Sequence, residues 1–333
     1  MGLNRELLYE KALGVLYGTA IGDALGMPTT FLDRVTIKER YGFVDKFMNP
    51  SPDNGVHSQL KAGAYTDDTA LTFALARAII REGKVNPEAV ADELLRWAKA
   101  NDALEGTIIG PSTRIAIERI LAGIPVEYSG TSGTTNGCAM KISPVGIFDC
   151  SRSYEEMLED VIKACMPTHY TGIAISGAMA VATAVKIGIN GGKYPAEISI
   201  ESLKMARIAG KAIDGKSISN RIFEAFGIGG RDDQDYLDNL FSFLKEPQGA
   251  LTEDAVPAAL SIFVRSGGDF KRALLLACNL GGDSDTIGAI VGAISGSYCG
   301  ISGIPIEWIR TIDANSQNDI RKLTGDLVNA TQI

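Results

Sequence analysis

The sequence predicts an all-α protein that folds as one compact domain over residues 1–333. Three observations support this class: apolar residues recur with helical spacing in segment after segment, alternating strand patterns are few, and capping residues or prolines stand at the expected helix starts. No internal repeat or low-complexity tract interrupts the pattern. With 333 residues, 45% of them apolar, the chain is long enough to bury a substantial core.

The first expected helix covers residues 6–25, where apolar residues recur with a helical period. Gly14, Gly18 and Gly22 follow one another every four residues within it, which lets another helix or a ligand approach closely. Asp23 lies inside the same apolar run and therefore needs a partner. It either supports a functional site or caps an adjacent turn.

Residues 43–64 are rich in turn-forming types and lack a sustained period, so we expect a loop or flap directly before the next helix. Thr66 is expected to cap that helix, which runs to about Glu82 and is apolar nearly all round. Residues 227–233 are expected to form a loop without a chemical role. Further helices are expected near residues 87–100, 112–122, 153–164, 168–187, 195–212, 217–226, 252–265, 269–279, 287–300, 305–312 and 317–329.

Two carboxylates, Asp283 and Asp285, follow the pair Gly281–Gly282, where the backbone can turn sharply. Asp283 is expected at a helix N-cap, with Asp285 and Thr286 in the first turn. Carboxylates at a helix start are also favoured for structural reasons alone, because they cap backbone N–H groups and complement the helix dipole. This stretch by itself leaves a structural and a functional interpretation open.

A second acidic helix start, Thr66-Asp67-Asp68-Thr69, favours the functional interpretation. Hard divalent cations prefer several oxygen ligands, which carboxylates and hydroxyls supply. If the two helix starts faced each other, they would supply four carboxylates and two hydroxyls. The two stretches together predict a site for two divalent cations, Mg²⁺ or Mn²⁺.

Residues 130–141 form a second candidate binding segment. Seven of these twelve residues are Gly, Ser or Thr, and Lys141 carries the only charge. Such a loop can present backbone N–H groups to a phosphate, although it lacks the Walker pattern, and a plain turn-rich linker has the same composition. His169, expected at a helix start, is a structural donor or a catalytic group; the structural role is the commoner one for a lone histidine.

Charge and cysteine content exclude several classes of protein. The net charge of −8 argues against binding to nucleic acid or to an anionic membrane. The start of the chain is polar, and no run of 18 charge-free apolar residues has membrane-type flanks, so we expect a cytoplasmic protein without a signal peptide. The five cysteines lack CxxC spacing and are expected to be reduced thiols: Cys138, Cys150, Cys165, Cys278 and Cys299.

Four segments, in this order and spacing, resemble the ADP-ribosylglycohydrolase family, whose founding members are the dinitrogenase reductase-activating glycohydrolases. They are Gly18-Thr-Ala-Ile-Gly-Asp-Ala-Leu-Gly26, Thr66-Asp-Asp-Thr69, Asn136-Gly-Cys-Ala-Met140 with Pro144-Val-Gly146, and Leu280-Gly-Gly-Asp-Ser-Asp-Thr286. The resemblance implies an orthogonal helical bundle with a binuclear Mg²⁺ or Mn²⁺ site. It also implies hydrolysis of the bond between ADP-ribose and an acceptor on a protein or a small conjugate.

The resemblance also implies roles for individual residues. Those implied as metal ligands are Thr66, Asp67, Asp68, Asp283, Asp285 and Thr286, with Asp285 placed to bridge the two cations. Asp67, Asp68 and Asp285 are implied as catalytic, since Asp67 or Asp68 can also orient or deprotonate the attacking water. Those expected to bind or support the substrate are Asp23, Gly133, Thr134, Asn136, Gly137, Met140 and His169.

The sequence departs from the family's pattern at Thr30, where a glutamate is common in a flap over the substrate. Threonine neither acts as a base nor carries charge at neutral pH. Lys141 stands where an arginine is frequent, and lysine lacks the bidentate fork. Two alternatives therefore remain: an N-glycosidase that acts on nucleosides or other ribosyl metabolites, and a non-catalytic member that binds ADP-ribose. The complete set of carboxylates argues against the second, because burying them without a cation is costly.

Overall fold

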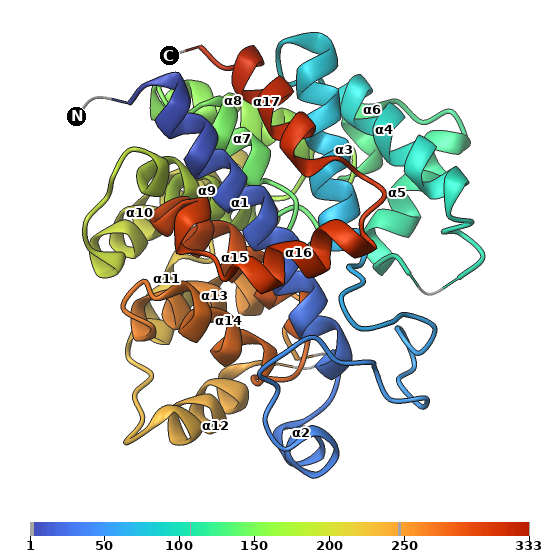
Figure 1. Cartoon of the computed structure of the whole chain (residues 1–333). Helices are drawn as coiled ribbons and strands as arrows, with labels where there is room; N and C mark the ends of the chain where they lie inside the picture. Colours follow the sequence, from blue (N-terminus) through green and yellow to red (C-terminus); the bar gives the residue numbers. More distant parts are fainter. Residues whose placement is uncertain (1–2, 107, 246–247, 333) are drawn as a thin grey trace.

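The computed structural model of the chain describes residues 3–106, 108–245 and 248–332 (Figure 1). It is 66% helical and has no strand in these ranges, which confirms the predicted all-α class. Isolated backbone bridges pair Leu32 with Gly282 and Thr135 with Leu251. Both bridges join segments that border the candidate site.

The helices follow the order of the chain. The first half contains α1 (Arg5–Gly26), η1 (Met27–Thr29), α2 (Arg34–Tyr41), α3 (Asp67–Glu82), α4 (Pro87–Ala100), α5 (Pro111–Leu121), α6 (Val126–Ser129), α7 (Ser143–Phe148) and α8 (Tyr154–Cys165). The second half contains α9 (Gly172–Ile189), α10 (Pro195–Ile213), α11 (Ser219–Phe226), α12 (Asp233–Phe243), α13 (Thr252–Arg265), α14 (Phe270–Cys278), α15 (Ser284–Cys299), η2 (Ile301–Gly303), α16 (Ile306–Asn315) and α17 (Ile320–Ala330).

The central feature of the fold is the antiparallel pair α1 and α15, which crosses the middle of the molecule in Figure 1. Small residues meet along the whole contact, so the two backbones touch. A Cβ atom added to Gly18 would lie 2.1 Å from the carbonyl oxygen of Gly292, and one added to Gly22 would lie 1.9 Å from that of Gly288. The predicted close approach is therefore to another helix. It places the C-terminal end of α1, with Asp23, against the N-terminal end of α15.

Substitution of Gly18 by alanine should destabilise the protein, because the new methyl group cannot fit without moving the backbone of α15. Overpacking of this kind costs about 1–3 kcal/mol. Gly325→Ala in α17 is the matched control: its Cβ would meet nothing nearer than Tyr9 Cε2 at 3.8 Å. Alanine there should raise stability by about 1 kcal/mol through helix propensity. Urea unfolding of both variants checks the opposite signs, and a Gly18→Ala protein as stable as the wild type would contradict the packing argument.

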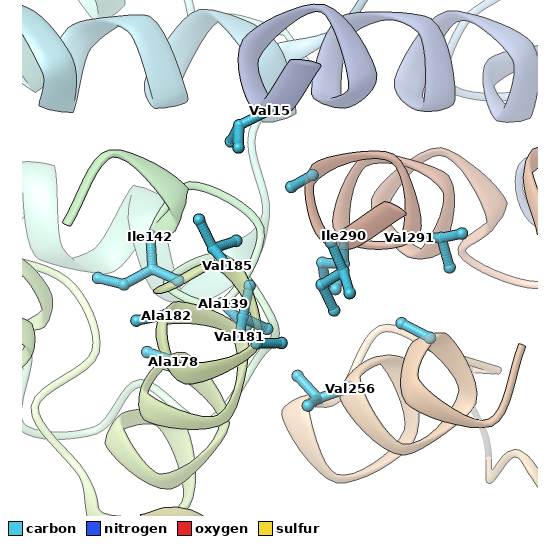
Figure 2. Packing of buried hydrophobic residues seen from close by; sticks show 14 of the residues in the cluster. Val15, Ala139, Ile142, Ala178, Val181, Ala182, Val185, Val256, Ile290 and Val291 are labelled. Carbon is cyan, nitrogen blue, oxygen red and sulfur yellow. The ribbon is translucent and has the colours of Figure 1, made fainter. Parts of the chain in front are cut away.

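The core lies around this pair. Figure 2 shows Val15 of α1 and Ile290 of α15 facing side chains of α9 and α13, among them Val185 and Val256. Helix α9 is also the one helix in the described ranges that is long and apolar enough to cross a membrane, but 89% of it is buried inside the protein. It therefore packs as a core helix.

Among the α-helices of the described ranges, α2, α6, α7 and α12 had not been predicted. Helix α2 buries Ile37 alone, so it carries no apolar period that sequence analysis could detect. Helix α12 begins right after the predicted loop and buries Tyr236, Leu237 and Leu240. Asp232 caps it by accepting the backbone N–H of Asp235, and this capping residue was an available signal.

The expectation that all five cysteines are reduced is wrong for two of them. Cys138 and Cys165, both buried, form a disulfide with their Cα atoms 5.7 Å apart, within the range that a bridge can span. The fold explains this pairing, because the loop that carries Cys138 packs against the C-terminal end of α8. Cys150, Cys278 and Cys299 are free, as predicted.

Candidate active site

The start of α15 presents two of the predicted carboxylates. Gly281 and Gly282 have φ angles of 81° and 63°, a left-handed turn that favours glycine. Asp283 follows at the N-cap position, as predicted, but its side chain does not cap the helix. It accepts instead a hydrogen bond of 2.6 Å from Asn136 Nδ2. Asp283 and Asp285 thus both face the same cavity.

The start of α3 presents the other two carboxylates. Thr66 caps the helix, as predicted, by accepting the backbone N–H of Asp68. The Thr66 hydroxyl also donates to Asp68 Oδ2 at 3.0 Å. Asp68 Oδ1 is buried and has no hydrogen-bond partner in the described part of the chain. Asp67 lies beside it, also at the cavity.

Asp23 of α1 holds the start of α3 in place through hydrogen bonds with Thr66 and Thr69. The carboxylate is fully buried and accepts the backbone N–H groups of Thr66, at 2.9 Å, and Thr69, at 3.1 Å. It also accepts the Thr69 hydroxyl at 2.6 Å. Of the two interpretations of Asp23, the structure displays the cap for an adjacent turn. Asp23 does not line the cavity, so its position does not support the substrate contact expected from the resemblance.

The two helix starts meet at a cavity of about 210 Å³. Carboxylates form one side, the segment after Gly130 forms another, and apolar side chains complete the wall. The lining residues are Phe31, Val56, His57, Asp67, Asp68, Ile108, Ile109, Gly110, Pro111, Thr113, Thr135, Asn136, Gly137, Met140, Ala250, Asp283, Asp285 and Thr286. Distant parts of the chain therefore contribute to one site, as predicted from the two acidic stretches.

Burial and mutual repulsion dominate the electrostatics of the carboxylates. They raise the pKa of Asp23 and Asp67 to about 7 and that of Asp68 and Asp283 well above its ordinary value. Asp285 is the exception. Burial would raise its pKa too, but the hydrogen bond and charge of His57 outweigh burial and hold it at about 2.

The chemistry of these donors fits a divalent cation. Carboxylates that repel one another, with one buried oxygen lacking a partner, are relieved by positive charge. In the described residues, however, no group of three or more His, Cys, Asp or Glu side chains is arranged to hold a metal ion. Asp283 accepts a hydrogen bond from Asn136, and Asp285 accepts one from His57.

The segment after Gly130 contributes only its second half to the cavity. Asn136, Gly137 and Met140 line it, as expected, and so does Thr135, which had not been predicted. Gly133 is buried and Thr134 is exposed, and neither lines the cavity. A Cβ atom on Gly133 would lie 2.3 Å from the carbonyl oxygen of Thr168, and the Thr134 carbonyl accepts the hydroxyl of Thr252. The loop is thus anchored inside the fold, which places its first residues away from the cavity.

His169 also differs from the expectation that it lines the substrate cleft. It is fully buried behind the loop, with Nε2 2.9 Å from Thr135 Oγ1 and Nδ1 2.8 Å from Thr168 Oγ1. Burial, with the nearby charge of Lys141, holds the pKa of His169 well below its ordinary value, so the ring is neutral. The structural interpretation of this histidine is the one its contacts support. Lys141 is buried as well and donates to Thr168 Oγ1 at 3.0 Å.

The sequence analysis missed His57, the histidine that does enter the cavity. Its Nε2 lies 2.8 Å from Asp285 Oδ2, and its side chain is 5% exposed. The available signal was its position in the flap-like segment directly before the acidic helix start. Thr30 is buried nearby, and its hydroxyl oxygen accepts the backbone N–H of Asp285 at 3.3 Å.

The all-α fold and the carboxylate-lined cavity define the class: a helical protein whose candidate active site lies between paired acidic helix starts. Comparison with known proteins specifies the family. The sequence profile of the ADP-ribosylglycohydrolase family matches residues 4–333. The chain therefore belongs to that family, whose members hydrolyse ADP-ribose linkages and are generally metal-dependent.

Individual relatives match over almost the whole chain. The uncharacterized protein YegU of Escherichia coli is 33% identical over 94% of this chain and 95% of its own length. The ADP-ribosylarginine hydrolase Tri1 of Pseudomonas putida is 28% identical over 98% of this chain and 80% of its own length. A solved structure described as an ADP-ribosylglycohydrolase-related protein complex has a TM-score of 0.75 at 26% identity and covers 98% of this chain and 100% of its own.

Proposed function

We propose that this protein hydrolyses the glycosidic bond between ADP-ribose and an acceptor, a protein side chain or a small conjugate, at a site for two divalent cations. One observation carries the proposal. Four carboxylates from the starts of α3 and α15 line a single cavity, and burial together with mutual repulsion raises the pKa of three of them, Asp67, Asp68 and Asp283. A binding scaffold has no need of such an arrangement, because buried carboxylates without a cation cost stability.

The residues that would hold the cations are the six implied by the family's motifs: Thr66, Asp67, Asp68, Asp283, Asp285 and Thr286. Bound Mg²⁺ or Mn²⁺ supplies Lewis acidity and makes water more acidic. Thr66 does not line the cavity as its side chain stands, since its hydroxyl is turned to Asp68. It would therefore have to rotate to serve as a ligand.

The protein's own groups account for the rest of the reaction. Cleavage of a bond to ribose develops oxocarbenium character at the anomeric carbon, which the carboxylates stabilise electrostatically. Asp67 or Asp68 orients or deprotonates the attacking water. Asn136 and Gly137 line the same cavity and are the residues that would contact the ribose and diphosphate. Asp23 holds the start of α3 so that these groups keep their places.

A second candidate substrate class is a smaller ribosyl compound such as a nucleoside. The cavity of about 210 Å³ lies below the range of about 300–1,000 Å³ usual for ligand pockets. Thr30 lacks the charge of the flap glutamate, and the neighbouring wall is apolar, with Phe31, Ile108 and Ile109. Both features suit a compact, uncharged acceptor better than a cationic one.

Hydrolysis assays on matched substrates test the proposal. The protein should release ADP-ribose from an ADP-ribosylarginine peptide when Mg²⁺ or Mn²⁺ is present, and lose this activity in EDTA. Nucleosides assayed in parallel test the second class, because a preference for substrates without the adenylate half would transfer the assignment to it. Metal-independent hydrolysis, or binding of ADP-ribose with no turnover of either class, would contradict the proposed reaction.

A further inference from the structure

His57 is the one side chain, among the described residues that line the cavity, that can carry a positive charge. It comes from the segment between α2 and α3, which we call the cover segment (residues 49–64). The ring reaches Asp285, 228 positions further along the chain, and its Nε2 donates to Asp285 Oδ2 at 2.8 Å. This contact joins a loop without regular structure to the carboxylate that the family's motif assigns to both cations.

A turn stabilised by the Asn54 side chain places His57 beside Asp285. Asn54 Oδ1 accepts the backbone N–H groups of Val56, at 3.0 Å, and His57, at 2.8 Å. Asn54 is itself buried, at 4% exposure, and its amide donates to the Thr30 carbonyl at 3.5 Å. A side chain that satisfies its own polar groups in this way fixes the local backbone. The approach of His57 is therefore set by the turn and not by a free loop.

The cover segment is also tied to α2. Arg40 forms a two-point contact with Asp53, at 2.7 Å and 2.9 Å, and donates to Ser51 Oγ at 2.7 Å. These contacts are exposed and so contribute little stability. The buried links on the cavity side are the pair of His57 and Asp285 and the contact of Asn54 with the Thr30 carbonyl.

Asp285 is held at both of its oxygens. Oδ1 accepts the backbone N–H of Thr286 at 3.0 Å, and Oδ2 accepts His57 Nε2. A carboxylate oxygen has two lone pairs, so each oxygen keeps capacity for a further contact. The backbone N–H of Asp285 donates to Thr30 Oγ1. Removing His57 would leave Oδ2 without this donor and free the side chain to turn away from its carboxylate neighbours.

We propose that His57 is a positioning residue that fixes the Asp285 carboxylate for cation binding and fastens the cover segment over the cavity. The first half of this proposal rests on the proposed two-cation function; the second half does not. Partners that hold a ligating carboxylate typically change metal affinity by about 10–100-fold when they are removed. His57 thereby links the cover segment to Asp285, whose backbone N–H donates to the hydroxyl of Thr30.

Two measurements on the same set of full-length variants test both halves. Mn²⁺ alone is titrated by calorimetry, and amide hydrogen exchange is followed over residues 49–64. His57→Ala should weaken Mn²⁺ binding by about 10–100-fold and speed exchange in the cover segment. His57→Gln keeps an N–H donor and should recover most of both effects. Gln59→Ala removes an exposed side chain of the same segment and should change neither.

The two halves can fail separately. Mn²⁺ binding by His57→Ala that equals or exceeds that of the wild type would overturn the positioning role, since His57 would then be neutral or a competitor of the cation. Unchanged exchange in residues 49–64 would overturn the fastening role. A wild type that binds no Mn²⁺ would overturn the proposed function together with the positioning half, while exchange would still decide the fastening half.

Discussion

Asp285→Asn should lower the rate of ADP-ribose release by at least about 10³-fold, which corresponds to about 4 kcal/mol of transition-state stabilisation. Asn preserves the shape of the side chain and an oxygen that His57 can reach. It removes the charge from the carboxylate whose pKa is held at about 2 in this cluster. Asp285 is therefore anionic at neutral pH, and its charge is what a cation would bind most strongly.

The prediction is checked by single-turnover hydrolysis together with the Mn²⁺ content of the purified variant. Asp326→Asn is the control: this carboxylate lies in α17, is 42% exposed, and pairs with Lys322 on the surface. It should leave both readouts unchanged. If Asp285→Asn or Asp285→Ala retained normal hydrolysis and normal metal content, Asp285 could not be the shared ligand of a two-cation site.

Much of the fold could be predicted because local patterns determine it. Helices with a buried apolar face, such as α3 and α9, could be predicted from the spacing of their apolar residues. The small residues of α1 likewise predict that another segment packs closely against it. Helix α2 could not be predicted in this way, because it buries only Ile37 and therefore has no periodic apolar pattern in the sequence. The identity of the close neighbour, α15, was likewise beyond local reasoning, because it depends on tertiary packing.

The candidate site divides in the same way. The carboxylates of both acidic stretches could be predicted, because helix starts aim them in a known direction and their chemistry is recognisable. His57 and His169 could not be placed by such reasoning. One lies in a segment without period and reaches the cavity through the Asn54 turn, and the other lies behind a loop whose path follows from its contacts with α13 and Thr168. The path of a loop depends on contacts with residues far away in the sequence. Composition alone therefore does not reveal whether a side chain of the loop lines the cavity.

Asp67→Asn should stabilise the EDTA-treated protein by about 2–4 kcal/mol at pH 8. The folded pKa of Asp67 is about 7, against an ordinary value of 3.8, because the group is buried beside Asp285 and Asp23. The folded protein thus binds this proton more tightly than the unfolded chain does. Stability of the EDTA-treated wild type should therefore fall as pH rises from about 4 to about 7, and remain at the lower level above pH 7. The amide removes the charge and flattens this dependence.

Saturating Mn²⁺ should reverse the order of the two proteins. A ligand that binds only the folded state at 1,000 times its dissociation constant adds about 4.1 kcal/mol, and the wild type keeps all its carboxylates for that purpose. Thermal unfolding with EDTA and with Mn²⁺ at pH 5 and pH 8 measures this reversal. Asp92→Asn, at an exposed position of α4, should shift neither curve. If Asp67→Asn were no more stable than the wild type in EDTA at pH 8, electrostatic repulsion among the carboxylates would not destabilise the folded protein. The cavity would then have no electrostatic reason to recruit a cation, which links the stability of this protein directly to its proposed chemistry.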